Sequence, residues 1–154
     1  MKRITSIVFL VCCQISAAAE SSWSLISVEE MSKYAGDESS VSLSIRAVPD
    51  PAAPEIIVHS PDASRDLSSP TDIKVSFRAS AGARVRPETF RVKYGALGLD
   101  VTDRIVSRFP PTDSGLNVAN AELPTGNHVF VLSISDSLGR ISVRRLAVKV
   151  IKGR

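Results

Sequence analysis

Apolar and polar residues alternate with a period of two over most of the chain from residue 55 onward. This alternation is typical of strands with one buried face, and Gly, Pro, Asn and Asp recur between the alternating stretches. About seven short strands, roughly one per dozen residues, predict an all-β fold in which two antiparallel sheets pack as a sandwich. The positions expected to share a buried face within each strand are Ile56, Val58, Ile73, Val75, Phe77, Phe90, Val92, Tyr94, Leu97, Leu99, Val101, Leu116, Val118, His128, Phe130, Leu132 and Ile134.

The last alternating stretch changes parity halfway along. Ile141 and Val143 occupy one face, whereas the apolar residues from Leu146 to Val150 occupy the other. Burying all of them in one core would require one extra residue, because a shift by one position turns every following side chain to the opposite face. We therefore predict a β-bulge at Arg144–Arg145.

The first nineteen residues have the pattern of a secretory signal peptide. Lys2 and Arg3 precede a mostly apolar run of about ten residues, roughly half the length that a membrane-spanning helix needs. Small residues follow, which predicts cleavage near Ala19 and a mature chain with no stable membrane span. Both cysteines, Cys12 and Cys13, lie in this segment, so we expect a mature domain without disulfides. The form of the signal and the lack of an Asn-x-Ser/Thr pattern predict a periplasmic or secreted bacterial protein.

Residues 20–53 are expected to form an arm ahead of the sandwich. Ser27 and Glu30 have the spacing of a capping box, which predicts a short helix that continues to about Tyr34 and stops at Gly36.

The second half of the arm has a different pattern. Residues alternate from Val41 to Ile45, which predicts a strand, and three prolines between positions 49 and 54 predict a stiff linker or the start of a strand. The sandwich is then expected over residues 54–152. Trp23, the only tryptophan, belongs to the arm and is expected to lie outside the sandwich.

The charge of the mature chain is nearly balanced, with 17 basic residues (19 minus Lys2 and Arg3) against 16 acidic ones. The last fifteen residues nevertheless carry six basic residues and no acidic one, which indicates an electropositive strand that attracts an anionic partner. The alternative is structural, because charged side chains on an edge strand also prevent unwanted strand pairing. The candidate partner-binding residues are Arg140, Arg144, Arg145 and Lys149.

One stretch contains the residue types of a hydrolytic triad, namely His128, Ser133 and Asp136. On a strand, the odd separation places Ser133 on the opposite face from His128, and Asp136 lies about 26 Å further along. The three groups cannot reach one another, and Asp136 with Gly139 instead predicts a tight turn. His59 has no nucleophile motif near it either, so we expect that the protein is not an enzyme.

The sequence gives only weak indications of a metal site or a nucleic-acid-binding site. Asp100 and Asp103 leave calcium open, but calcium takes roughly six to eight oxygen ligands, and turn formation or pairing with Arg104 explains both residues better. The mature chain has no thiol and its two histidines are far apart, which argues against zinc. The basic C-terminal strand has no aromatic residue for stacking on bases. We therefore expect no cofactor and no nucleic-acid partner.

Several segments resemble bacterial Ig-like domains, which are fibronectin- and Ig-type β-sandwiches. LPTGNHVFVLSISDSLGRIS, residues 123–142, is similar to their final hairpin, and SPDASRDLSSPTDIKVSFRA, residues 60–79, to their opening strands. VKYGALGLDVTDRI, residues 92–105, together with GLNVANAELPTG, resembles small exported proteins of the bacterial envelope that carry one such domain. The resemblance covers residues 54–152 and indicates a fold rather than an activity.

Together these observations predict a non-catalytic, exported binding or structural module whose partner is an envelope protein or a polyanionic glycan, met by the basic strand or an open sheet edge. Two alternatives stay open: an accessory domain of a glycan-acting enzyme, and a single-domain periplasmic protein that resembles a chaperone. Chaperones that lend a strand to a client use two Ig-like domains, whereas this chain has room for one domain and an arm.

Overall fold

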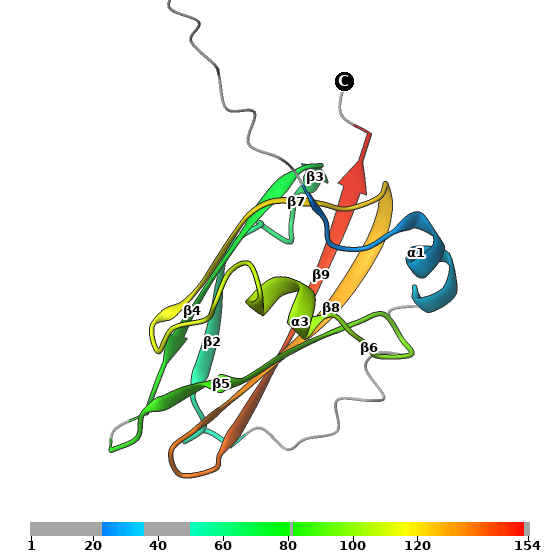
Figure 1. Ribbon diagram of the computed structural model, residues 1–154. Helices are drawn as coiled ribbons and strands as arrows, with labels where there is room; N and C mark the ends of the chain where they lie inside the picture. The colour runs from blue at the N-terminus through cyan, green and yellow to red at the C-terminus, as the bar shows by residue number, and fades with distance from the viewer. Residues whose placement is uncertain (1–22, 36–49, 81, 153–154) are drawn as a thin grey trace, which may run out of the picture.

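The computed structural model describes residues 23–35, 50–80 and 82–152 as two packed β-sheets with two short helices (Figure 1). The sheets have the strand orders β1-β7-β4-β2 and β3-β9-β8-β5-β6, and all pairs are antiparallel except β1 with β7 and β3 with β9. The prediction of an all-β sandwich is confirmed. The predicted signal peptide and the strand around Val41–Ile45 lie outside the described residues.

The elements are β1 (Trp23–Ser24), α1 (Val28–Tyr34), β2 (Glu55–Ser60), β3 (Asp66–Ser68), β4 (Thr71–Arg78), β5 (Val85–Tyr94), β6 (Leu99–Asp100), α3 (Thr102–Val106), β7 (Gly115–Glu122), β8 (Gly126–Asp136) and β9 (Ile141–Ile151).

The core lies between the two sheets and contains most of the predicted apolar positions. Phe77 of β4 and Phe90 of β5 join the layers, with their ring centroids 5.5 Å apart. Leu97 is an exception, because it lies in a turn after β5 and is 71% exposed. The alternation therefore identified the buried faces of the long strands and failed where the chain turns. The core also includes Val85, Val101, Leu116, Val118, Leu132, Ile134, Leu146, Val148 and Val150.

The predicted bulge at Arg144–Arg145 is wrong. β9 pairs with β8 without a register shift from Ile141 to Val150. The second half of β9 contributes its apolar side chains to the core. Because the pairing stays regular, Ile141 at the start of the strand points to the other face and is 63% exposed. In this sheet the register shifts instead between β5 and β8, from Arg86 to Arg91, a stretch that contains Pro87, which has no N–H group to donate to the ladder.

The start of the arm is part of the sandwich, so the expectation that Trp23 lies outside it is wrong. Trp23 is buried in β1, pairs with β7, and donates a hydrogen bond from Nε1 to the Ala119 carbonyl at 3.1 Å. Leu25 and Ile26 follow and are essentially inaccessible to solvent. This short arm segment completes the core at the edge of the first sheet.

Helix α1 begins and ends as predicted. Its capping box is formed, since the Ser27 side chain accepts from the Glu30 N–H and the Glu30 carboxylate accepts from the Ser27 N–H. Glu30 also receives two hydrogen bonds from Arg104 of α3, at 2.9 and 2.5 Å. These bonds, chiefly that from Arg104, lower the pKa of Glu30 to about 2, so the arm is held to the sandwich by an ion pair across much of the pH range.

A buried polar chain lies where β8 begins. His128 is 1% exposed; its Nε2 lies 2.7 Å from the Pro124 carbonyl oxygen and its Nδ1 lies 3.0 Å from the Tyr94 hydroxyl. A carbonyl only accepts, so Nε2 carries the proton and Nδ1 accepts from Tyr94. Burial lowers the pKa of His128, and the hydrogen bond to Pro124 opposes this in part. The folded protein therefore favours neutral His128 with its proton on Nε2.

This arrangement predicts a loss of stability in mild acid. The pKa of His128 is lower in the folded than in the unfolded chain, so the unfolded state binds more protons once the pH falls below about 6.5. We expect the free energy of unfolding to decrease as the pH falls through this range, and His128→Phe to remove that decrease. Urea denaturation at a series of pH values checks this. An identical pH profile for the two proteins would contradict it.

Among the residues that the structure describes, no helix is long and apolar enough to cross a membrane.

Candidate functional site

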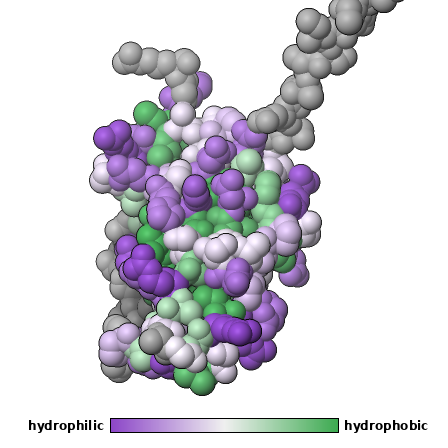
Figure 2. All heavy atoms as spheres, turned by 90° about the vertical axis from the view of Figure 1, so that its left-hand side faces the viewer, coloured by the Kyte–Doolittle hydropathy of each residue, from purple (hydrophilic) through white to green (hydrophobic). Residues whose placement is uncertain are grey.

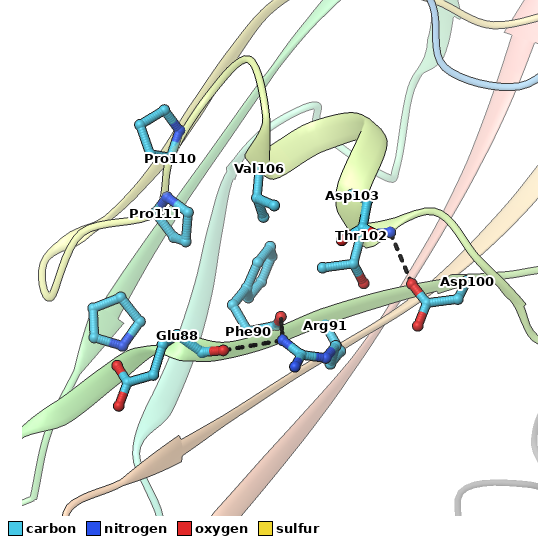
Figure 3. A pocket seen from close by; sticks show the side chains of 10 residues that line it. Glu88, Phe90, Arg91, Asp100, Thr102, Asp103, Val106, Pro110 and Pro111 are labelled. Atoms are coloured by element: carbon cyan, nitrogen blue, oxygen red, sulfur yellow. Dashed lines mark hydrogen bonds between the residues drawn. The ribbon is translucent and has the colours of Figure 1, made fainter.

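A hollow of about 670 Å³ lies between β5, helix α3 and the loop that follows α3 (Figure 3). Phe90 forms its floor and is only 1% exposed, so the hollow opens directly above the core. Val106 of α3 faces Phe90, and Pro110 and Pro111 follow the loop on one side. Because proline fixes its own backbone angle, the wall that these two residues form is stiff.

Helix α3 is the element that creates the hollow, and the sequence pattern did not predict it. The Asp100 carboxylate accepts from the Thr102 N–H at 2.9 Å at the start of the helix. The Thr102 hydroxyl in turn accepts from the Val92 N–H at 2.9 Å, which fastens the helix to β5. Hydrogen bonds from Thr102 lower the pKa of Asp100. Asp100 is thus a turn-former, as expected.

Charged groups surround the opening of the hollow. Arg91 donates from one nitrogen to the carbonyl oxygens of Glu88, at 3.0 Å, and Phe90, at 2.7 Å, as Figure 3 shows. The Glu88 carboxylate pairs with Arg86 at 2.7 Å, and the Arg86 hydrogen bond lowers the pKa of Glu88. The exposed carboxylate of Asp103 makes no hydrogen bond within the part of the chain that the structure describes.

The hollow combines apolar and charged side chains. Three acidic residues, Glu88, Asp100 and Asp103, line the hollow, and the described residues contain no group of three or more His, Cys, Asp or Glu that could hold a metal ion. Of the two expected roles for these aspartates, turn formation holds for Asp100, whereas Arg104 pairs with Glu30 rather than with an aspartate. Stiff apolar walls beside charged groups suit a segment of polypeptide, which presents apolar side chains and backbone polar groups together.

The predicted triad residues lie apart, as expected. His128 faces the core and Ser133 lies on the outer face of the second sheet. Asp136 forms the predicted turn: its carboxylate accepts from the backbone N–H groups of Leu138 and Arg140, at 2.9 and 3.0 Å. Gly139 has the left-handed φ of 76° that this turn requires.

The structure does not gather the four candidate partner-binding residues into one patch. Arg140 binds the buried carboxylate of Asp136 at 2.7 Å, and Lys149 pairs with Asp66 at 3.4 Å. Arg144 and Arg145 are adjacent on a regular strand, so they point to opposite faces of the sheet; Arg144 is exposed and Arg145 is half-buried. The binding role of these residues stays a prediction, but two of them already neutralise acidic groups of the same chain.

Sequence reasoning noted Asp100 and Asp103 and missed the other lining residues. The signal that was available is Pro110–Pro111, a rigid pair that follows five residues of helix and an aromatic residue. A hollow of this kind depends on how a loop folds back over a strand, which periodicity does not encode.

No protein-family model and no curated protein matches the chain. A search of solved structures finds similarity to CopC from Methylosinus trichosporium OB3b, with a TM-score of 0.43 and 20% sequence identity, over 65% of this chain and 97% of that one.

Proposed function

We propose that the protein is a non-catalytic, exported module of the bacterial envelope that binds another protein in the hollow between β5 and α3. The observation that supports this proposal is the hollow itself. It is lined by the buried core residue Phe90, by two prolines in the loop after α3 and by charged groups at the rim. Export rests on the signal-like residues 1–19.

The Ig-like type is supported by strand order. In Ig sandwiches the strands follow the orders A-B-E-D and C-F-G. Here β2-β4-β7 correspond to A-B-E, β5-β8-β9 correspond to C-F-G, and β1 from the arm takes the place of D. A second feature is the corner before F, where a tyrosine of Ig domains bonds to backbone a few residues upstream. His128 makes this bond, to Pro124 four residues earlier.

The hollow favours a polypeptide over a sugar. Sugar rings are commonly held on exposed aromatic faces, whereas Phe90, the one aromatic among the ten described lining residues, is buried. A peptide segment needs apolar contact for its side chains and hydrogen-bonding groups for its backbone. Val106 and Pro111 supply the first, and Arg91, with guanidinium N–H groups beyond the two bonds it makes, supplies the second.

Charge reversal at the rim should weaken partner binding. We expect Asp103→Lys to reduce the partner recovered by cross-linking and affinity purification from intact envelopes by about tenfold or more, the equivalent of about 1.4 kcal/mol. Mass spectrometry of the retained proteins, with the wild-type chain alongside, provides the measurement.

The matched control is Asp113→Lys, which makes the same charge change at an exposed residue that does not line the hollow. The proposal fails if both variants retain the partner equally, or if both lose it while folded. Expression from the full-length sequence makes the same preparation informative about export, because its intact mass reports whether residues 1–19 have been removed.

A further inference from the structure

A second hollow lies over β4 and β7 and adjoins the first one, with which it shares the lining residue Pro110. It has a volume of about 450 Å³, and we call it the β4–β7 trough; it is lined by Lys74 and Ser76 of β4, Asn117 of β7, and Arg108 and Phe109 of the loop after α3. Figure 2 views the molecule from the side of these strands and shows hydrophilic and apolar side chains intermixed on that face. Such a mixed surface offers hydrogen bonds and apolar contact at once.

The trough is basic. Lys74 and Arg108 are exposed, and neither forms an ion pair within the described residues. None of the eleven described residues that line the trough is acidic. The acidic residues close to it in sequence are Asp72, which accepts a hydrogen bond from the Asn120 N–H at 2.9 Å, and Asp113, which is exposed on the adjoining loop. Two cations that pair with no carboxylate among the described residues therefore attract an anionic ligand.

Neutral polar groups lie beside the two cations. Asn117 is the cross-strand neighbour of Lys74, so their side chains share one face of the sheet. The Ser76 hydroxyl lies 2.7 Å from Nε2 of His59 on β2. An amide and a hydroxyl both donate and accept, which suits ligand hydroxyl groups that do the same. A ligand with phosphate oxygens alone would use only the donors.

An aromatic residue completes the trough. Phe109 is half-buried and packs against Trp23, with ring centroids 5.8 Å apart. Arg108 lies over the Trp23 ring at 5.4 Å, which limits the positions that its guanidinium adopts. Phe109 therefore contributes an aromatic, apolar side chain to the lining beside the charge of Arg108.

We propose that the β4–β7 trough binds an acidic polysaccharide, with Lys74 and Arg108 on sugar carboxylates, Asn117 and Ser76 on sugar hydroxyls, and Phe109 against an apolar ring face. The proposal goes beyond the protein-binding function of the first hollow and does not depend on it. If both hold, the module connects a protein to a glycan of the envelope. None of these residues belongs to the basic C-terminal strand that the charge pattern indicated.

The test uses short oligogalacturonate as the probe, with its methyl-esterified, uncharged counterpart as the ligand control. Isothermal titration calorimetry on the folded, mature chain should show binding to the first and none to the second. We expect Lys74→Gln/Arg108→Gln to weaken binding by about tenfold or more, because two charge-assisted contacts are removed. Far-ultraviolet circular dichroism and the melting temperature establish that the variant is folded.

The matched variant is Arg84→Gln/Lys152→Gln, which changes the net charge equally at two exposed residues outside the trough. It should bind the probe like the wild type. An equal loss in both variants would assign binding to net charge and overturn the site. Equal affinity for inorganic polyphosphate and oligogalacturonate would overturn the assignment to a sugar, and absence of binding to oligogalacturonate would overturn the proposal.

Discussion

Phe90→Ala should lower the free energy of unfolding by about 3–5 kcal/mol, the usual cost of removing a buried aromatic ring and leaving a cavity. Phe90 is 1% exposed, packs against Phe77 of the opposite sheet, and supports the floor of the first hollow. Its loss therefore weakens the contact between the layers and the site above it. Urea denaturation monitored by circular dichroism measures the change.

The control for this prediction is Phe90→Leu, which keeps most of the apolar volume and should cost about 1.5 kcal/mol. If Phe90→Ala were no more destabilising than Phe90→Leu, Phe90 would not hold the two sheets together. The slope of the unfolding free energy against urea should stay the same in both variants, because neither changes the surface exposed on unfolding.

Arg140→Met should produce the second large effect, a fall of about 10 °C in melting temperature. Asp136 is completely buried, and Arg140 supplies its charge partner from the same turn, at 2.7 Å. Burial alone would raise the pKa of Asp136, but hydrogen bonds from the Arg140 side chain and from two backbone N–H groups outweigh it and keep the pKa below 3.8. Removing Arg140 leaves a buried carboxylate without its cation.

The comparison variant is Lys149→Met, which breaks an exposed pair with Asp66 and should change the melting temperature by only a few degrees, about 3 °C at most. A carboxyl group whose pKa is lower in the folded chain than in the unfolded chain stabilises the fold at pH values above its unfolded-state pKa. That stabilisation is lost as the pH falls through its folded-state pKa. The difference between wild type and Arg140→Met should therefore shrink once the pH falls below 3.8. Equal melting temperatures for the two variants at neutral pH would contradict the role of Arg140.

The fold could be predicted from the sequence where strands are long and have one buried face. The alternation around Val75, Phe90 and Leu132 identified the core faces because each strand contributes several apolar residues in register. The capping box at Ser27 and the turn at Asp136 were also correctly predicted, since both depend on hydrogen bonds between residues close in sequence.

Features that depend on tertiary contacts were not predictable. The position of Trp23 follows from parallel pairing with β7, almost a hundred residues later, for which no local pattern exists. The bulge prediction failed because it assumed that Ile141 must be buried, whereas the sheet tolerates one exposed isoleucine near a turn.

The candidate sites were the least predictable part. Charge along the sequence indicated the C-terminal strand, but Arg140 and Lys149 proved to be partners of Asp136 and Asp66. The basic residues without such partners in the trough, Lys74 and Arg108, are 34 positions apart and meet only because the loop after α3 folds against β4. Sequence charge alone does not distinguish a neutralised arginine from an available one.

Site-specific photo-cross-linking in intact envelopes tests the central claim, protein binding in the first hollow, most directly. A photoreactive amino acid at Val106, inside the hollow, should yield a discrete protein adduct that disappears when Asp103→Lys is added. The same group at Asp113, outside the hollow, should yield no such adduct. A discrete adduct from position 113 with none from position 106 would contradict the claim.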